Sequence, residues 1–162
     1  VTKIDTKIFK GKKLILFDAD RTLYPYETTT TSKEVIAWVK KHKKKNKFLI
    51  LSNSKNMDKR GPTIEKQLGC PVFYHNLMKP SSTLFKLVQE KYPYKGKEMV
   101  MVGDMYLTDG LFGLRHGMTM VLVKPFYLKS VSVKESMKSK VSTVVGNYVI
   151  LGFLKFLKKI GF

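Results

Sequence analysis

The segment LILFDADRTL, residues 14–23, decides the fold of this chain, because an apolar run stops abruptly at two carboxylates. Residues 14–17 are typical of a strand buried on both faces of a parallel sheet. Asp18 and Asp20 then follow at the carboxyl end of that strand, where open α/β sheets place their ligands. Taken alone, such an acid pair is just as typical of a helix cap or a turn, so other segments must separate these interpretations.

A second acidic cluster repeats the layout. The segment EMVMVGDMYLTDG, residues 98–110, is an apolar run, then a glycine, then Asp104 and Asp109. Asp18, Asp20, Asp104 and Asp109 are four of only 12 acidic residues in a chain with 31 Lys and Arg. Chance would seldom place a third of the acids at the ends of two strands. The repetition therefore favours one shared site over two unrelated turns.

Two more apolar runs end in polar residues. The run FLILSNS, residues 48–54, ends in Ser52 and Asn53, whose hydroxyl and amide groups can bind phosphate oxygens without adding charge. A shorter strand is expected at residues 72–74, followed by Lys79 and Pro80. Pro80 suits the first turn of a helix from 81 to about 92, which would place Lys79 at that helix N-terminus. Helices are also expected at 32–42 and 57–68.

This ordered set of residues resembles the haloacid dehalogenase (HAD) superfamily of phosphohydrolases. The matching motifs are DxDxT at 18–22, the apolar run ending in Ser52, Lys79, and GDxxxTD at 103–109. LSNS at 51–54, MKP at 78–80 and GLR at 113–115 make the chain most similar to the YqeG-like branch, which includes mitochondrial phosphatidylglycerophosphate phosphatases. The resemblance runs from about residue 4 to 161. It implies a three-layer, Rossmann-like α/β fold with a mostly parallel sheet, as a single domain over residues 1–162.

The resemblance also implies a role for each residue. Asp18 would be the nucleophile that forms an aspartyl-phosphate, and Asp20 the general acid and base. The metal would be Mg²⁺, bound by the Asp18 and Asp104 carboxylates and the Asp20 backbone carbonyl, since a divalent cation must neutralise the phosphate. Lys79 would hold nucleophile and phosphate together. Phosphate oxygens would be bound by Ser52, Asn53 and Lys79, with Thr22 in a supporting position.

Two positions are less determined. Asp109 could ligate the metal directly, ligate it through water, or accept a hydrogen bond that orients Lys79. Arg21 departs from the family, which usually carries Asn between the second Asp and the Thr. The acids and Thr22 are retained, so activity should survive, and the added cation bears on substrate detail more than on mechanism.

The spacing leaves no room for a cap domain. Residues 23–47 hold a Thr-rich loop and one helix, and residues 54–77 hold one helix and a short strand. An open site cannot enclose a small metabolite. It favours phosphate on something large, such as a lipid headgroup, a protein or a nucleic-acid end.

Composition adds weaker constraints. A single Cys70 provides no disulfide framework, so a reducing, intracellular compartment is expected. The family resemblance implies a location in the cytoplasm or on the matrix side of the mitochondrial inner membrane. No apolar run is long enough to cross a bilayer. Because the chain opens with Val1 rather than Met, the printed sequence leaves open whether its N-terminus is complete. Only three of the 31 basic residues are Arg, at 21, 60 and 115, so genomic lysine enrichment explains the +19 charge as well as an anionic partner does.

The lysines at 40–47 come just before a strand, so they are expected at the amino edge of the sheet, opposite the acids. The last segment, 144–162, is expected to form an amphipathic helix at about 144–161 with a wide apolar arc and a lysine side. It either closes the sheet or lies on an anionic membrane surface.

These observations lead to a working hypothesis. The chain is expected to be a Mg²⁺-dependent phosphomonoesterase that converts phosphatidylglycerophosphate to phosphatidylglycerol, with an anionic phospholipid as its substrate partner. The alternatives are a phosphatase for phosphoprotein or polynucleotide ends, although nucleic acid is not favoured, and an idle lysine-rich binding protein on the same fold. Oligomeric state is not indicated by the sequence.

Overall fold

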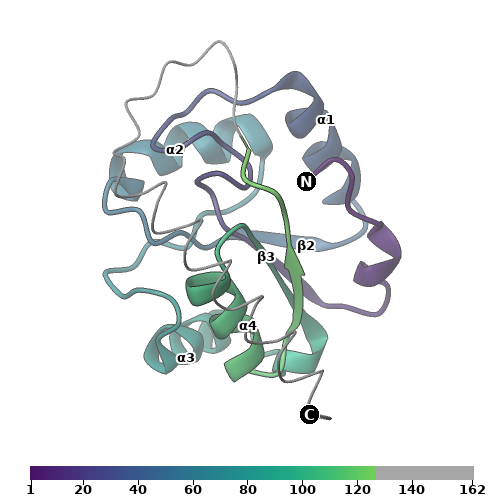
Figure 1. Ribbon diagram of the computed structural model, residues 1–162, viewed down its shortest axis with the longest axis vertical. Coiled ribbons are helices and arrows are strands. Elements are labelled where there is room, and N and C mark those ends of the chain that lie inside the picture. Colours follow the sequence, from purple (N-terminus) through teal and green to yellow (C-terminus); the bar gives the residue numbers. More distant parts are fainter. Residues whose placement is uncertain (127–162) are drawn as a thin grey trace, which may run out of the picture.

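The computed structural model describes residues 1–126, which form a four-stranded parallel sheet in the order β2-β1-β3-β4 (Figure 1). The strands are β1 (Leu14–Phe17), β2 (Lys47–Ile50), β3 (Met99–Gly103) and β4 (Thr119–Leu122). β1 pairs with both β2 and β3, in register from Leu14 opposite Lys47 and Met99. All residues of β1 and β3 are buried, as their uninterrupted apolar sequences predict.

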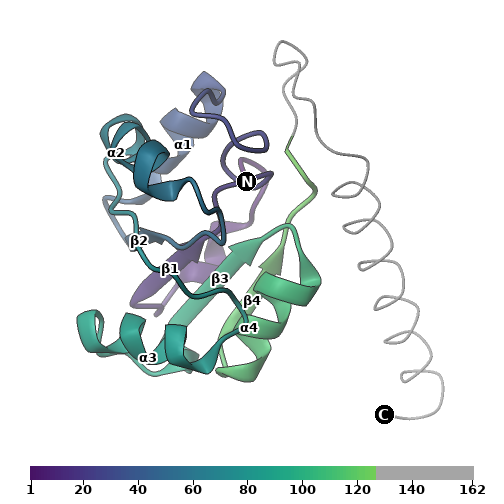
Figure 2. The ribbon, with the colours of Figure 1, turned by 90° about the vertical axis from the view of Figure 1, so that its left-hand side faces the viewer.

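Helices cover both faces of this sheet (Figure 2). α1 (Lys33–His42) and α2 (Met57–Leu68) lie on one face, and α3 (Ser82–Lys91) and α4 (Leu111–Arg115) on the other. Short turns of 3₁₀-helix occupy Thr6–Phe9 and Gly96–Glu98, and a π-helical turn spans Tyr106–Gly110. The predicted three-layer α/β fold with a parallel sheet is confirmed. The helix predicted at about 144–161 lies outside the described residues.

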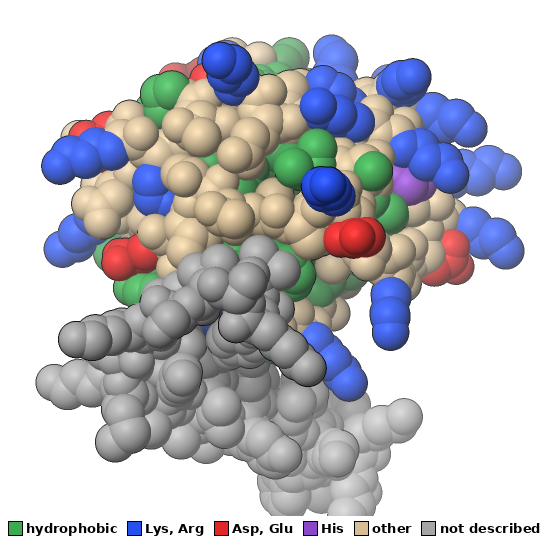
Figure 3. Space-filling model, turned by 90° about the horizontal axis from the view of Figure 1, so that it is seen from above, with side chains coloured by type: hydrophobic (Ala, Val, Ile, Leu, Met, Phe, Trp, Pro, Cys, Tyr) green, Lys and Arg blue, Asp and Glu red, His purple; other side chains and the backbone are tan. Residues whose placement is uncertain are grey.

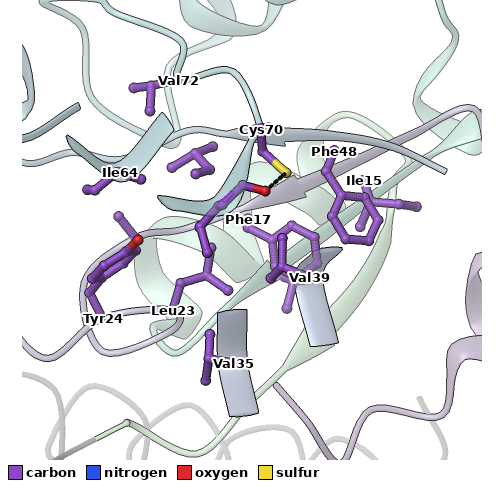
Figure 4. Close-up of a cluster of buried hydrophobic side chains, with 14 of the residues drawn as sticks. Ile15, Phe17, Leu23, Tyr24, Val35, Val39, Phe48, Ile64, Cys70 and Val72 are labelled. Carbon is purple, nitrogen blue, oxygen red and sulfur yellow. Dashed lines mark hydrogen bonds between the residues drawn. The ribbon is translucent and has the colours of Figure 1, made fainter. Parts of the chain in front are cut away.

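The strands bury alternate side chains in two separate cores. Ile15 and Phe17 point toward α1 and α2, where they join Val39, Ile64 and other apolar side chains (Figure 4). Leu14 and Leu16 point the opposite way, toward α3 and α4. Cys70 lies in the first core as a buried free thiol, and burial raises its pKa to about 11.

Two local predictions were wrong. Residues 72–74 do not form a strand of the sheet. Val72 makes only an isolated parallel bridge to Ile50. Pro80 does not lie in the first turn of α3. The helix begins at Ser82, and the Ser81 side chain caps it by accepting from the backbone N–H of Leu84 at 3.4 Å. A serine oxygen can satisfy a free helical N–H, which proline cannot do, so Ser81 sets the start of the helix.

No domain is inserted on either side of the second strand in the described chain. The segment between β1 and β2 holds a loop and α1, and the segment from β2 to Lys79 holds α2 and loops. The carboxyl edge of the sheet is therefore left without a cap by the described elements. No helix in this part of the chain has the length and hydropathy required to cross a bilayer.

Candidate active site

The carboxyl ends of β1, β2 and β3 meet around one cleft of about 500 Å³. Asp18 directly follows β1, and its backbone N–H donates to Val102 O of β3 at 2.9 Å. Leu51 follows β2 and donates to Phe17 O at 2.8 Å. This ladder aligns the three strand ends, so the polar residues after each strand share one space. The cleft is lined by the predicted residues Asp18, Asp20, Ser52, Asn53, Asp104 and Asp109, together with Arg21 and Met78.

Lys79 links the two acidic clusters. Its Nζ lies 2.6 Å from Asp18 Oδ1 and 2.6 Å from Asp109 Oδ1, and it donates to the Leu51 carbonyl at 2.7 Å. The residue is only 2% exposed. Burial works against its charge, but the carboxylates of Asp109 and Asp18 outweigh that effect and raise the pKa of Lys79. The amine is therefore a fixed positive charge beside the proposed nucleophile.

Asn53 positions the backbone of Lys79. The Asn53 Nδ2 donates to Lys79 O at 3.2 Å, and Lys79 N donates to Asn53 Oδ1 at 2.7 Å. These two hydrogen bonds engage the Asn53 side chain with the backbone of Lys79, whereas the sequence analysis predicted that Asn53 binds phosphate oxygens. Ser52 is buried, lines the cleft and accepts a hydrogen bond from Ser54 N at 3.3 Å. Phosphate binding by Ser52 and Asn53 stays a prediction.

Asp109 folds back beneath the cleft. Its Oδ2 accepts from Met105 N at 3.1 Å, and it lies against Gly103, where any Cβ would collide with the Asp109 carboxylate. Glycine at this position is thus required by close approach. Of the roles left open for Asp109, the contact with Lys79 supports the orienting one most directly.

Three carboxylates form a group that suits a divalent cation. Asp18, Asp104 and Asp109 each offer an oxygen, and these oxygens all lie within 4.8 Å of one another. All three residues are buried. Carboxylate oxygens are hard ligands of the kind that Mg²⁺ takes, so the residues fit the metal that the sequence predicted. No histidine of the described chain joins this group.

Burial dominates the pKa values of Asp18 and Asp104. Burial raises the pKa of Asp18 to about 8; Lys79 opposes the rise, and the carboxylates of Asp109 and Asp20 add to it. Burial likewise raises the pKa of Asp104 to about 7, against the opposing charge of Arg21. A bound divalent cation would favour the ionised forms of both groups.

Asp20 is held by Arg60, a contact that sequence reasoning missed. The guanidinium donates to both carboxylate oxygens, from Nη2 to Oδ1 at 2.7 Å and from Nη1 to Oδ2 at 3.1 Å. Arg60 also donates to Thr28 O, and Glu27 N donates to Asp20 Oδ1 at 2.9 Å. A signal did exist in the sequence. Arg60 falls on the apolar side of its helix, with Met57, Gly61, Ile64 and Leu68, and it is one of only three arginines.

Arg21 lines the cleft but is buried. Its Nε lies 3.2 Å from Asp104 Oδ2, and its Nη2 lies 3.3 Å from the Met105 sulfur. The guanidinium carbon lies 5.5 Å from the centre of the Tyr26 ring.

The next residue, Thr22, is 1% exposed and its hydroxyl has no hydrogen-bond partner among the described residues, so its supporting role stays a prediction.

Two solved structures share this architecture, and one of them is a HAD family enzyme. The chain superposes on a HAD family enzyme from Bacteroides thetaiotaomicron, solved with magnesium and inorganic phosphate, at a TM-score of 0.52 and 13% identity, covering 74% of this chain and 98% of that one. It also superposes on an uncharacterized protein from Listeria monocytogenes serotype 4b at a TM-score of 0.55 and 20% identity, covering 74% and 86%. These likenesses define the class of the fold as HAD-like.

Sequence comparison then gives the family. Residues 1–126 match the family model described as mitochondrial PGP phosphatase. The chain is 32% identical over 117 residues to the probable phosphatase YqeG of Bacillus subtilis and 30% identical over 128 residues to the chloroplastic/mitochondrial phosphatidylglycerophosphate phosphatase 1 of Arabidopsis thaliana. These matches cover 72% of this chain in both cases, and 66% and 35% of the two relatives. The chain belongs to the PGP phosphatase (YqeG-like) family of HAD-superfamily phosphatases, which confirms the family resemblance.

Proposed function

We propose that this protein is a Mg²⁺-dependent phosphomonoester hydrolase that works through an aspartyl-phosphate on Asp18 and acts on phosphatidylglycerophosphate. The observation that carries the proposal is the contact of Lys79 with Asp18, in a cleft where Asp104 and Asp109 complete a buried carboxylate group. Lys79 holds the Asp18 carboxylate in place and supplies positive charge where a phosphate dianion would approach.

Each step uses a residue of the cleft. An Asp18 oxygen attacks phosphorus, and the bond from phosphorus to the leaving oxygen breaks as Asp20 gives that oxygen a proton. Asp20 then takes a proton from water, whose oxygen attacks phosphorus and releases inorganic phosphate and free Asp18. Arg60 fixes the orientation of the Asp20 carboxyl, which lines the cleft, through its two-point contact. When bound, Mg²⁺ would be held by Asp18 and Asp104 and would neutralise the charge of the phosphate.

A lipid substrate is supported by the open cleft and by the family. Met78 lines the cleft and is 59% exposed, and Tyr74 lines an adjoining hollow and is 46% exposed. Apolar side chains at an uncapped mouth suit a phosphate carried on a large, partly apolar molecule. The Arabidopsis thaliana relative is named a phosphatidylglycerophosphate phosphatase, and the chain spans about a third of its length. Membrane contact through residues 144–162 is a further part of the hypothesis and lies outside the described residues.

A phosphate-release panel tests this proposal. Phosphatidylglycerophosphate in mixed micelles, a phosphopeptide and a 3′-phosphorylated oligonucleotide are compared with and without Mg²⁺, with Asp18→Asn as the control for contaminating phosphatase. We expect Mg²⁺-dependent release from the lipid at the highest kcat/KM. Preference for the peptide or oligonucleotide would replace the lipid assignment, and release from none of them would favour the idle binding protein.

A further inference from the structure

Two basic side chains contact the three carboxylates of the metal group, Asp18, Asp104 and Asp109. Lys79 contacts Asp18 and Asp109. Asp104 is contacted instead by Arg21, through Nε at 3.2 Å from Oδ2. Both partners of this second pair are nearly excluded from solvent, with side-chain exposures of 7% and 2%. Thus Asp104, a proposed ligand of the metal, already has a positive partner that belongs to the chain itself.

The backbone around Arg21 holds its side chain at this point. Arg21 has φ of +59°, in the left-handed region that non-glycine residues seldom adopt. Its N–H donates to Tyr24 O at 2.6 Å and its carbonyl accepts from Phe126 N at 2.6 Å, which keeps the turn closed. The turn therefore directs a guanidinium toward Asp104, at a position between Asp20 and Thr22 of the nucleophile loop.

We infer that Arg21 is an internal counter-cation of Asp104 that competes with the divalent metal for this carboxylate. The inference rests on the proposed function for the identity of the metal. Without metal, Arg21 stabilises the buried charge of Asp104. When the metal binds, it must either displace the guanidinium or share Asp104 with it, and in both cases the positive charge of Arg21 weakens metal affinity. Arg21 is in this sense a positioning residue that acts through Asp104 and sets the Mg²⁺ affinity of the site.

Calorimetric titration of the intact protein with MgCl₂ tests the inference. Arg21→Gln removes the charge and should lower the Mg²⁺ Kd by about tenfold or more, because one positive charge close to a divalent ion is removed. Arg21→Lys retains the charge and should stay close to the wild type. Lys44→Gln, with the same charge change beside a hollow lined by Lys43, Lys45 and Lys47 at the start of β2, controls for net charge and should also leave the Kd unchanged.

A second measurement separates competition from other roles of Arg21. In EDTA, Arg21→Gln should lower Tm because Asp104 loses the positive charge of Arg21, and saturating Mg²⁺ should raise Tm more in this variant than in the wild type. An unchanged or higher Mg²⁺ Kd in Arg21→Gln overturns the inference. Weaker binding of orthovanadate with an unchanged Mg²⁺ Kd would also overturn it, and would assign Arg21 to the phosphate instead.

The two levels of proposal fail in different ways. If neither the wild type nor Arg21→Gln binds Mg²⁺, the metal-dependent function fails and the inference fails with it. If the wild type binds Mg²⁺ and Arg21→Gln binds it no more tightly, only the competition is lost. If Arg21→Gln binds Mg²⁺ measurably and the wild type does not, the inference is supported.

Discussion

The two edges of the sheet use positive charge in opposite ways. At the carboxyl edge, Lys79, Arg21 and Arg60 are buried, and each contacts a carboxylate in the cleft. At the amino edge, lysines bond to neutral oxygens. Lys12 Nζ donates to Lys97 O at 2.7 Å, and Lys47 Nζ donates to the Tyr94 hydroxyl at 2.9 Å. In the view of Figure 3, Lys and Arg side chains project from many points of the described surface and acidic side chains from few.

Among the described basic residues, position therefore separates those that contact the acids of the cleft from those that do not. The lysines at 41–47 line hollows beside the start of β2 and around Phe9 and Gly11, away from the cleft. This confirms their predicted place at the amino edge. Charges there are exposed and are screened by salt, whereas charges in the cleft are buried and fixed by their partners. Substitutions in the cleft should therefore change activity and stability far more than substitutions at the amino edge.

Asp18→Asn should reduce kcat by several orders of magnitude, because it removes the nucleophile and a metal carboxylate together. The fold should remain, since asparagine has nearly the same shape. The measurements are single-turnover phosphate release and the circular dichroism spectrum. Turnover within about tenfold of the wild type, in protein free of contaminating phosphatase, would exclude the aspartyl-phosphate mechanism.

Lys79→Met should lower the free energy of unfolding by about 3 kcal/mol, because it leaves Asp18 and Asp109 buried without their cation. Lys44→Met is the matched change at the amino edge and should have little effect. Urea unfolding at neutral pH without metal compares the two variants. Equal losses of stability at both positions would remove the distinction between the edges.

Arg60→Gln should slow the reaction of an alkyl phosphate by about ten- to a hundredfold, because Asp20 loses the contact that orients it for proton transfer. An aryl phosphate should suffer less, since its leaving group departs with little help from a proton. Lys59→Gln, an exposed neighbour on α2, is the control. Equal losses on both substrates would mean that Arg60 serves the fold and not the proton transfer.

Stability gained from Mg²⁺ should increase as pH rises from about 4 to 8. Asp18 and Asp104 have folded-state pKa values of about 8 and about 7, raised from 3.8, so the metal-free folded state binds more protons than the unfolded state in this range and loses stability as pH rises. Mg²⁺ holds both groups ionised and should remove that loss.

The pH effect is measured as the difference in Tm with and without Mg²⁺. Burial lowers the pKa of His75 and of His116, which gives an opposite slope that cancels in this difference. Asp104→Asn should largely abolish the pH dependence. A difference in Tm that is constant from pH 5 to 8 in the wild type would contradict the assignment of these carboxylates to the metal.

The smallest effect is expected from the amino edge. Changing Lys41, Lys44 and Lys45 together to Gln should alter kcat/KM for a small phosphate ester by less than about twofold at physiological salt, because these exposed charges are screened over the distance to the cleft. Steady-state kinetics at low and physiological salt measure the effect. A larger change that persists at physiological salt would show that the lysines of this edge act on the reaction.

Three of the four strands, the order of the acids and the family could be predicted from the sequence, whereas β4 (Thr119–Leu122) was missed and residues 72–74 were wrongly given in its place. Apolar runs of four or five residues that stop before Asp18, Ser52 and Asp104 are typical of buried parallel strands, and the carboxyl ends of parallel strands share an edge of the sheet. The helix predicted at about 57–68 is confirmed as α2, and Gly69, with φ of +62°, forms its C-cap.

The partners of the charged groups could not be predicted from the sequence, because they depend on tertiary packing. Arg60 reaches Asp20 from 40 positions away along the chain, and Lys79 reaches Asp18 from 61 positions away. No local pattern encodes such a pairing, because it depends on how α2 and the loop before α3 pack against the sheet. The same holds for Asn53 and the backbone of Lys79, for Arg21 turned onto Asp104 by a left-handed residue, and for Val72, which makes one bridge and no strand. Periodicity and spacing define which surfaces are buried, but side-chain contacts between distant segments are set by packing.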